Sequence, residues 1–326
     1  MIKIVLIKED KEIDISAFCS NVTRKDNIKS LGVELEFEYI NNETIDKHTV
    51  FVSPSLGNTI ILYDSSVNIF QGQIVKASRD GLSSYKYSAF DNAFYLNKQE
   101  ARIQFNNITV KAAIEKLCEQ EYIPCEVACD IDTKVTKIYN GDTISKIIDD
   151  LLKLAQDDTG KRYRREYNYG KLYVNAFDNL KMIWQSEPLV SDFSQDFDTT
   201  KLANKVVVMS GKEKSQVVVA TAEDKASQKI YGTYVHYEKV DDKKKTQAQT
   251  IANNKLKAMA WPSKQFKCTL LGDNYVRSGR ILKFNQPNIG LIGEYLVTDC
   301  THSYDAGKHT MDCELTKSEE VNNGDS

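Results

Sequence analysis

Two cysteines and two histidines near the end of the chain have the residue types of a zinc site. The sequence reads Cys300-x-His302 and, after a short turn, His309-x3-Cys313. In a hairpin the histidines can pair across the turn, and strand alternation then puts both cysteines on their face. Zinc takes four such ligands in a tetrahedron. Cysteine and histidine are also ordinary residues on a half-buried strand face, and nothing else in the chain indicates a metal. We therefore expect no metal and no cofactor.

A basic and aromatic cluster, Lys161–Arg165, has the composition of a nucleic-acid contact, in which aromatic rings stack on bases and cations meet phosphates. Strand alternation places Tyr163 and Arg165 on one face, and Arg164 with Glu166 on the other. Acidic residues close by offset the positive charge. We interpret the cluster as the solvated surface of a hairpin.

Two further motifs are interpreted as structural features and not as binding sites. Gly141–Lys146 resembles the opening of a LysM peptidoglycan-binding module, but the second short helix and the Asn-rich strand of that module do not follow. Its Asp-Thr pair is equally suited to cap a helix.

Asp192, Asp196 and Asp198 lack the glycine and the closing glutamate of a calcium loop, so we interpret them as part of an acidic linker.

The motifs that mark common enzymes are missing from the sequence. It contains no G-x-S-x-G, no H-E-x-x-H, no phosphate loop and no Gly-rich dinucleotide turn. Cys118, Cys125 and Cys129 have no histidine near them in the sequence, and we interpret them as packing residues. We predict that the chain has no catalytic residues and is not an enzyme.

Length and composition indicate a globular protein of several domains. The chain has 326 residues, a formal net charge of −3 and 41% hydrophobic residues, which suits two or three domains with real cores. Its charge gives no indication of a nucleic-acid partner. No apolar run approaches transmembrane length, so we expect no membrane contact. The 7 cysteines show no framework spacing, which indicates reduced thiols in a cytoplasm.

Alternating apolar residues predict a β domain in residues 1–104. The alternation is clear in Ile2–Leu6 and again in Leu31–Phe37. Gly72 lies inside a further predicted strand, as is common at a bulge or a barrel corner. The other strands predicted here are Thr49–Val52, Thr59–Tyr63, Val67–Lys76 and Tyr85–Phe90. Six or seven short strands favour a small barrel.

In residues 105–182 the spacing of the apolar residues changes to that of α-helices. One helix is predicted to begin after Thr109 and another after Thr143, each with the threonine as N-cap. Gly160–Asn168 and Lys171–Phe177 then read as a β-hairpin. The apolar positions that define the helices are Val110, Ala113, Ile114 and Leu117 in the first, and Ile144, Ile147, Ile148, Leu151 and Leu152 in the second. This is the pattern of a small inserted α+β domain.

Residues 183–316 are predicted to form a second β-barrel domain, entered through the acidic linker Ser186–Lys205. A helix is expected at Lys243–Ala260. The strands expected around it are Gln216–Ala220, Thr233–Lys239, Gln265–Leu271, Arg280–Asn285, Leu291–Ser303 and Lys308–Thr316. The polar residues 317–326 are predicted to form a flexible tail.

Five short phrases occur along the chain in order. They are Phe70-x-Gly72-x-Ile74, Thr159–Val174, the run from Asp198 to Val208, Gly293-x-Tyr295-x-Val297, and the run from His302 to Leu315. These phrases, and the order of the predicted elements, resemble the baseplate hub proteins of contractile phage tails and tail-like bacteriocins (tailocins), the XkdQ-type and late-control-protein-D-type hubs. The resemblance covers nearly the whole chain.

The resemblance implies a mainly β protein in which two similar small β-barrel domains flank a helix-containing α+β insertion. It also implies a structural role as a homotrimer, whose six barrels form a ring between the six-fold tail tube and the three-fold central spike. The expected partners are the tube protein, the spike, and the baseplate wedge and tape-measure proteins. DNA would be met only in passage through the lumen. The expected location is the tail baseplate of a virion or bacteriocin particle, assembled in the bacterial cytoplasm.

One alternative from another class stays open. Tail-associated proteins can bind or hydrolyse the cell wall, and hubs of this kind sometimes carry a fused hydrolase. We expect no such domain here, because the second predicted barrel extends almost to the last residue. A wall-binding role through Gly141–Lys146 remains the other form of this alternative.

Overall fold

The computed structural model describes residues 2–28, 30, 32–42, 46–168, 170–180, 190–211, 216–240, 242–305 and 307–317. The chain forms two compact units. The first comprises Met1–Asp192, Cys268–Leu282 and Val297–Cys313, and the second comprises Phe193–Lys267, Lys283–Leu296 and Glu314–Ser326. Among the described residues no helix is long and apolar enough to cross a membrane.

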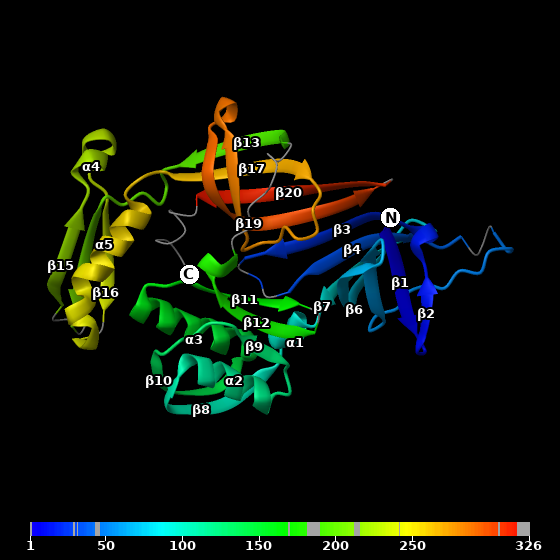
Figure 1. The fold of residues 1–326 in the computed structure, drawn as a ribbon, viewed down its shortest axis with the longest axis horizontal. Helices are drawn as coiled ribbons and strands as arrows, with labels where there is room; N and C mark the ends of the chain where they lie inside the picture. Colours follow the sequence, from blue (N-terminus) through cyan, green and yellow to red (C-terminus); the bar gives the residue numbers. More distant parts are fainter. Residues whose placement is uncertain are drawn as a thin grey trace. The chain divides into compact units, whose positions relative to one another are not determined.

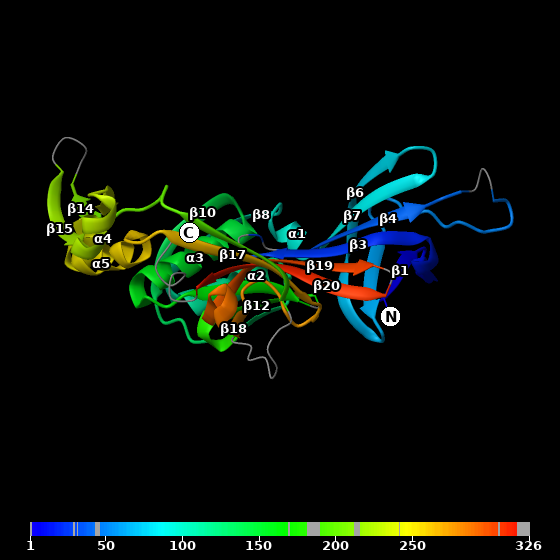
Figure 2. The same cartoon turned by 90° about the horizontal axis from the view of Figure 1, so that it is seen from above.

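A curled antiparallel sheet dominates the first unit (Figure 1). From the N-terminal strands onward its order is β2-β1-β5-β6-β7-β4-β3-β19-β20. The bounds are β1 Ile2–Lys8, β2 Lys11–Asp14, β3 Cys19–Asn27, β4 Glu34–Ile40, β5 Thr59–Asp64, β6 Val67–Asp80, β7 Ser84–Asp91, β19 Leu291–Asp305 and β20 Lys308–Lys317, with short helices η1 Ser16–Phe18 and α1 Ala93–Leu96. Strands far apart in the sequence meet here, since β3 pairs with β19 through Arg24 and His302. In both views β3 and β19 run side by side (Figures 1 and 2).

One core fills the curl of this sheet. Alternate residues of each strand point inward, which is why the period-two pattern predicted the strands. Leu35 and Phe37 of β4 and Ile60 and Leu62 of β5 are fully buried there, with Tyr304 of β19 packed against them. The mainly β class predicted from the sequence is therefore confirmed.

The strand predicted at Thr49–Val52 is wrong. Residues 46–58 lie outside any strand, and side-chain chemistry explains why. The Asp46 carboxylate accepts hydrogen bonds from the backbone N–H groups of His48 and Thr49, at 2.9 and 3.2 Å. Such a local turn competes with strand pairing.

Gly72 is required by a close backbone approach. A Cβ added at this residue would lie 2.2 Å from the carbonyl oxygen of Phe90 on β7. The register shifts on either side of it fall between Leu62 and Tyr63 and between Ile74 and Lys76. Gly72 itself keeps its pairing with Ile60 and Asp91, so it is not the bulge residue.

The helix-containing module follows in the first unit and has its own core. Its elements are β8 Glu100–Thr109, α2 Val110–Gln120, β9 Cys125–Val127, β10 Lys134–Thr143, α3 Ile144–Thr159, β11 Tyr163–Asn168, β12 Lys171–Ala176 and η2 Phe177–Leu180. β8 and β10 pair antiparallel, and each leads directly into a helix. Both predicted helices are confirmed, with Thr109 and Thr143 at the N-cap positions. The predicted hairpin is β11–β12, with β9 parallel to β12.

The second unit contains a three-stranded sheet, β15-β14-β16, whose inner face is covered by a helix. The elements are β14 Lys205–Ser210, β15 Val217–Glu223, α4 Lys225–Tyr231, β16 Val235–Val240, η3 Asp242–Gln247 and α5 Ala248–Met259. Val206 and Val208 of β14 pack with Ala248 and Ala252 of α5. In Figure 1 α5 lies beside the strands of this sheet. The predicted helix Lys243–Ala260 thus starts as a 3-10 turn and becomes α-helical at Ala248.

Asn204, a residue of the hub-like phrases, organises this small sheet. It is fully buried. Its side-chain amide donates to the Gly232 carbonyl at 2.7 Å, and its amide oxygen accepts from the Tyr234 N–H at 2.9 Å. A buried amide satisfied in this way fixes the turn that leads into β16.

The remaining strands are β13 Val190–Asp198, β17 Ser263–Leu271 and β18 Ile281–Gln286, with η4 at Pro287–Ile289. In the large sheet β13 pairs with β17, which pairs with β20, while β18 pairs with β19. The interpretation of Ser186–Lys205 as a linker was wrong in part, because Val190–Asp198 is a strand. As the terminal strand in the sheet order it needs few apolar residues, and its polar sequence concealed it.

Candidate functional site

A nine-residue loop, Gly272–Arg280, makes hydrogen bonds and ion pairs to several elements of the first unit. It connects β17 to β18. Backbone and side chains of this loop contact β3, the β11–β12 hairpin and β19, which lie far from it in the sequence. The hydrogen-bonded partners outside the loop are Arg24, Asp26, Asp64, Arg164, Glu166, Val297, Cys300, His302, Tyr304 and His309. We call this segment the 272–280 loop.

Buried ion pairs join this loop to β3 and to the hairpin. Arg277 Nε donates to Asp26 Oδ2 at 3.0 Å, and Ser278 Oγ donates to Asp26 Oδ1 at 2.8 Å. Ser278 Oγ also accepts from an Arg164 terminal nitrogen at 2.9 Å. We call Asp26, Arg164, Glu166, Arg277 and Arg280 the ion cluster.

The second carboxylate of the ion cluster belongs to the hairpin. Glu166 accepts two parallel hydrogen bonds from Arg280, at 2.9 and 3.0 Å, which is the strong bidentate form of this pair. Arg164 Nε lies 3.6 Å from Glu166. The cluster therefore links an element of the module to an element of the curled sheet by charge as well as by packing.

Each carboxyl of the ion cluster is kept ionised by its cations. Burial alone would raise the pKa of Asp26, but Arg277 and Arg164 hold it below the ordinary value. Burial acts on Glu166 in the same sense and is outweighed by the hydrogen bond and charge of Arg280, so its pKa is lowered too. Burial lowers the pKa of the Arg164 guanidinium. Because each charge is buried, removal of one partner would leave another uncompensated.

The interpretation of the hairpin as a solvated surface was wrong. The side chains of Arg164 and Glu166 are only 5% and 12% exposed. Arg165, on the opposite face of β11, pairs with Asp149 of α3. Strand alternation correctly separated these faces, but it could not show that the 272–280 loop covers one of them. Gly279 makes this cover possible, since it has φ +79° and a Cβ there would lie 2.2 Å from Arg164 Nε.

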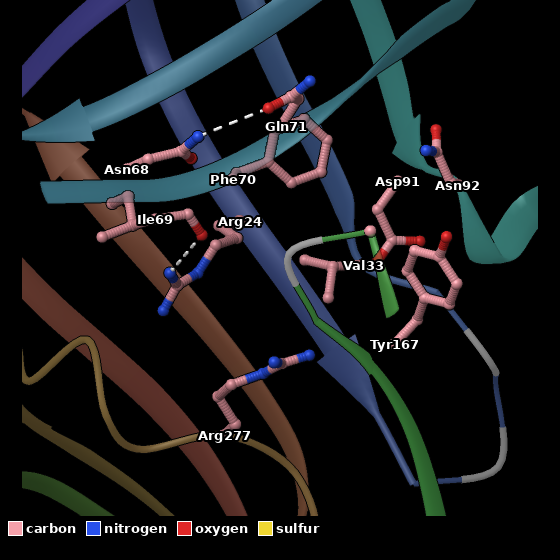
Figure 3. Close-up of a pocket in the computed structure, with 11 residues that line it drawn as sticks. Arg24, Val33, Asn68, Ile69, Phe70, Gln71, Asp91, Asn92, Tyr167 and Arg277 are labelled. Atoms are coloured by element: carbon pink, nitrogen blue, oxygen red, sulfur yellow. Dashed lines mark hydrogen bonds between the residues drawn. The ribbon is translucent and has the colours of Figure 1, made fainter. Parts of the chain in front are cut away.

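A pocket of about 200 Å³ adjoins the ion cluster in the first unit. Figure 3 shows its lining side chains. They are Arg24, Val33, Asn68, Ile69, Phe70, Gln71, Asp91, Asn92, Tyr167 and Arg277, together with Gly170. Arg24 is almost fully buried and donates to two backbone carbonyls, of Ile69 at 3.0 Å and of Asn274 at 3.3 Å. No sequence pattern indicated this pocket, because its residues come from six separate segments.

The structure brings together the cysteines and histidines that could have bound zinc. The Nε2–H of His302 donates to the Val276 carbonyl at 2.9 Å, and its Nδ1 lies 3.0 Å from His309 Nε2. The carbonyl fixes the tautomer, so Nδ1 accepts from His309. Cys300 Sγ lies 3.3 Å from His302 Nε2 and 3.7 Å from Cys313 Sγ. Across the described ranges, no three His, Cys, Asp or Glu side chains are grouped so that they could hold a metal ion.

Burial keeps these side chains neutral. It lowers the pKa of His302 to about 2, with the nearby Arg24 charge acting in the same direction, and it lowers the pKa of His309. The hydrogen bond with Cys300 and burial raise the pKa of Cys313, and burial raises that of Cys268 to about 12. Protonated thiols are poor nucleophiles and poor metal ligands. The arrangement is a packed, hydrogen-bonded strand face.

The other candidate residues lie in the core of the module or at the ends of helices and strands. Cys118 is buried in the core of the module, and Cys125 and Cys129 pack against it, which confirms the interpretation as packing residues. Gly141–Lys146 forms the end of β10 and the first turn of α3. Asp198 ends β13 and accepts a hydrogen bond from the Thr200 N–H at 2.7 Å.

Comparison with known proteins identifies the family. The model of the YQBQ-like family matches residues 22–316. The chain belongs to this family. A relative from Bacillus subtilis (strain 168), the phage-like element PBSX protein XkdQ, is 26% identical over 273 residues, which cover 82% of this chain and 83% of the relative. The XkdQ part of the resemblance is thereby confirmed for this YQBQ-like chain.

Solved structures share the fold. The 43 kDa tail protein of prophage MuSo2 from Shewanella oneidensis matches with a TM-score of 0.72 at 13% identity, covering 99% of this chain and 100% of that one. The E. coli c3393 protein, described as a component of the type VI secretion system with structural similarity to T4 bacteriophage tail proteins gp27 and gp5, matches with a TM-score of 0.52 at 9% identity, covering 92% and 73%. The YQBQ-like chain thus has the fold of phage tail proteins.

Proposed function

We propose that the chain is the baseplate hub of a contractile phage tail or tail-like particle. Three copies form a ring that joins the six-fold tail tube to the three-fold central spike. The observation that carries the proposal is the match of the chain along its length, to the YQBQ-like family over residues 22–316 and to a prophage tail protein over 99% of this chain. The likeness to a protein described as similar to gp27 and gp5 supports a place near the spike.

The role is one of assembly, and the physical properties of the first unit suit it. A ring that transmits load between a tube and a spike needs subunits that do not deform. Charged groups shared between the curled sheet and the module, as in the ion cluster, resist sliding of one on the other because each displacement leaves a buried charge unpaired. Closed rings also repeat one self-consistent interface.

The proposed partners follow from this position on the tail axis. They are further copies of the chain, the tail tube protein, the spike, and the baseplate wedge and tape-measure proteins, with DNA only in passage through the lumen. The chain would be assembled in the bacterial cytoplasm and act as a structural protein of the baseplate in a phage or a bacteriocin particle.

The test is to locate the chain in the particle. Particles carrying an affinity-tagged chain are imaged by cryo-electron microscopy, with retained infection or killing as the control that the tag is tolerated. We expect density for three copies on the tail axis, between tube and spike. Density in the sheath, the tube or the fibres would contradict the proposal. Clearing of peptidoglycan by the purified chain would contradict the purely structural role.

A further inference from the structure

The pocket beside the ion cluster has an excess of positive charge that its own carboxyls do not balance. Two guanidinium groups, of Arg24 and Arg277, line it, against the single carboxyl of Asp91. Arg24 donates to neutral carbonyl groups and forms no ion pair with any described residue. Burial raises the pKa of Asp91 to about 7, so near neutral pH this carboxyl is protonated for part of the time.

The surroundings add to this excess. Counting the pocket and the ion cluster together, the cations outnumber the carboxyls. The guanidinium groups are those of Arg24, Arg164, Arg277 and Arg280, and the carboxyls are those of Asp26, Glu166 and Asp91. An uncompensated cation in a mainly buried place is costly, and an anion bound there would remove that cost.

Arg277 presents unused donors to the pocket. Its Nε is taken by Asp26 at 3.0 Å, while neither terminal nitrogen has a hydrogen-bond partner within the described part of the chain. Figure 3 shows the Arg277 and Arg24 side chains on one side of the pocket, with Asp91 and Tyr167 together elsewhere in its lining. A pair of guanidinium N–H groups fits an oxyanion with two oxygens.

Neutral groups complete the lining. The Asn68 amide donates one hydrogen to Gln71 Oε1 at 3.5 Å and has a second N–H for a bound oxygen. The amides of Gln71 and Asn92 can also donate, and Phe70 and Val33 offer an apolar surface. Gln71 and Asn92 are exposed, so the pocket is open to solvent. Its volume of about 200 Å³ exceeds the roughly 15 Å³ that one water needs, which leaves room for a small organic ion.

We propose that this pocket binds a small monocarboxylate, held by Arg277 and Arg24 with the amide of Asn68. With Asp91 ionised the excess is one positive charge, which a single carboxylate matches while its two oxygens fit the fork of Arg277. A phosphate dianion matches less well, because Asp26 and Asp91 would repel its second charge.

The experiment measures thermal unfolding of the full chain in increasing acetate, with ionic strength held constant by chloride, and with inorganic phosphate as a parallel series. A ligand that binds only the folded chain raises the melting temperature in a saturable way. We expect saturable stabilisation by acetate that exceeds the effect of phosphate. No stabilisation beyond that of chloride would overturn the proposal, and stronger binding of phosphate would overturn the assignment as a carboxylate.

Variants locate the effect. Arg277→Lys keeps the charge and loses the fork, and we expect acetate to bind about tenfold more weakly. Lys25→Gln is the matched control, since it removes a cation next to Arg24 on β3 that points to the other face, where it pairs with Glu36. Acetate binding should be unchanged in it. If Arg277→Lys does not fold, Asn68→Leu takes its place, with weaker binding again expected. Wild-type binding in the pocket variant, or an equal loss in Lys25→Gln, would refute the site.

Discussion

Arg164 is a cation inside the first unit whose charge is shared among three groups. One terminal nitrogen bonds Ser278 at 2.9 Å, and the guanidinium lies between Asp26 and Glu166. The two carboxylates can stay buried because they face several cations at once. Arg164 therefore contributes to stability mainly by neutralising the buried carboxylates of Asp26 and Glu166.

Replacing Arg164 by methionine should destabilise the chain strongly. Arg164→Met keeps much of the apolar volume and leaves the buried Asp26 and Glu166 short of a cation, so we expect a loss of about 3–5 kcal/mol in the free energy of unfolding. Urea denaturation followed by circular dichroism measures it. Arg165→Met is the matched control on the opposite face. The Arg165 side chain is 11% exposed, but its partner Asp149 is 54% exposed and stays solvated when the cation is lost, so the cost should be clearly smaller than that of Arg164→Met. Equal losses in the two variants would show that the ion cluster is not special.

The neutral histidine pair should make stability depend on pH. In the folded chain the pKa of His302 is about 2 and that of His309 is lowered from 6.5. Because the unfolded chain binds more protons below pH 6.5, this contribution is complete above that pH and is lost as the pH falls. Below pH 6.5 the contribution of His302 to the free energy of unfolding should fall by up to about 1.4 kcal/mol per pH unit, and His309 acts in the same direction. Asp91, whose pKa burial raises to about 7, gains stability as the pH falls from 7 to 5 and opposes this loss, so the histidine contribution is read from the difference between the wild type and a histidine variant.

The variant His302→Phe tests this dependence. It removes one titrating group, so the slope of unfolding free energy against pH should become less positive than in the wild type below pH 6.5. His48→Gln, at an exposed residue outside the pair, serves as the control and should keep the wild-type slope. A slope that is the same in all three proteins would mean that other groups govern the acid response.

At the level of single residues, the sequence predicted which face of a strand a side chain occupies, but not which distant residues pack against that face. Alternation correctly put Cys300, His302 and Cys313 on one buried face. It also put Arg164 and Glu166 on one face of β11, but the residues that cover them, Ser278 and Arg280, are each 114 positions away. No local pattern carries such a distance, and so the ion cluster and its pocket were found only in the structure.

The two helices of the module begin in the same way but are capped differently. Each follows a strand that ends in threonine. The Thr109 side chain accepts a hydrogen bond from the Ala112 N–H at 3.2 Å, whereas the Thr143 side chain makes no capping bond to the backbone and lies 3.3 Å from Ser145 Oγ. A threonine directly before a helix thus makes a capping hydrogen bond in α2 and none in α3.

This difference predicts unequal costs for the same substitution. Thr109→Ala removes a cap and should lower the free energy of unfolding by about 1 kcal/mol. Thr143→Ala removes no cap bond and should cost clearly less, so each variant controls the other. Thermal or urea unfolding of the full chain gives both values. A larger cost for Thr143→Ala would indicate that the N-cap bond of α2 contributes little to stability.

At the level of elements, long periodic segments were predicted well and polar edge strands were not. The N-terminal ends of α2 and α3 were predicted correctly, because four or five apolar residues at helical spacing are typical of an α-helix and of no other element. β13 was missed because only parts of it are half-buried and its apolar residues, Val190, Phe193 and Phe197, do not alternate. The turn at Asp46 was missed because its hydrogen bonds to His48 and Thr49 override a short apolar pair.

For the molecule as a whole, the proposed hub role requires six similar barrels in a ring of three chains. The predicted domains, 1–104 and 183–316 flanking 105–182, would then present related surfaces around one axis. Similar folds with different sequences allow a three-fold ring to meet a six-fold tube, because each chain contributes two near-equivalent faces. This similarity remains a prediction, and superposition of the two β domains in an experimental structure tests it.

Assembly of the proposed hub depends on the area that its subunits bury against one another. A permanent trimer should bury more than about 2,000 Å² in total between subunits, and its partners can supply contacts that a lone subunit lacks. We therefore expect the purified chain to be monomeric or only weakly associated, and to form a complex of three chains with one spike trimer when the spike protein from the same gene cluster is added. Light scattering after size-exclusion chromatography gives both masses, and the chain mixed with the sheath protein is the control. A complex with a number of chains that three-fold symmetry does not allow, or binding to the sheath protein in preference to the spike, would remove the chain from the tail axis.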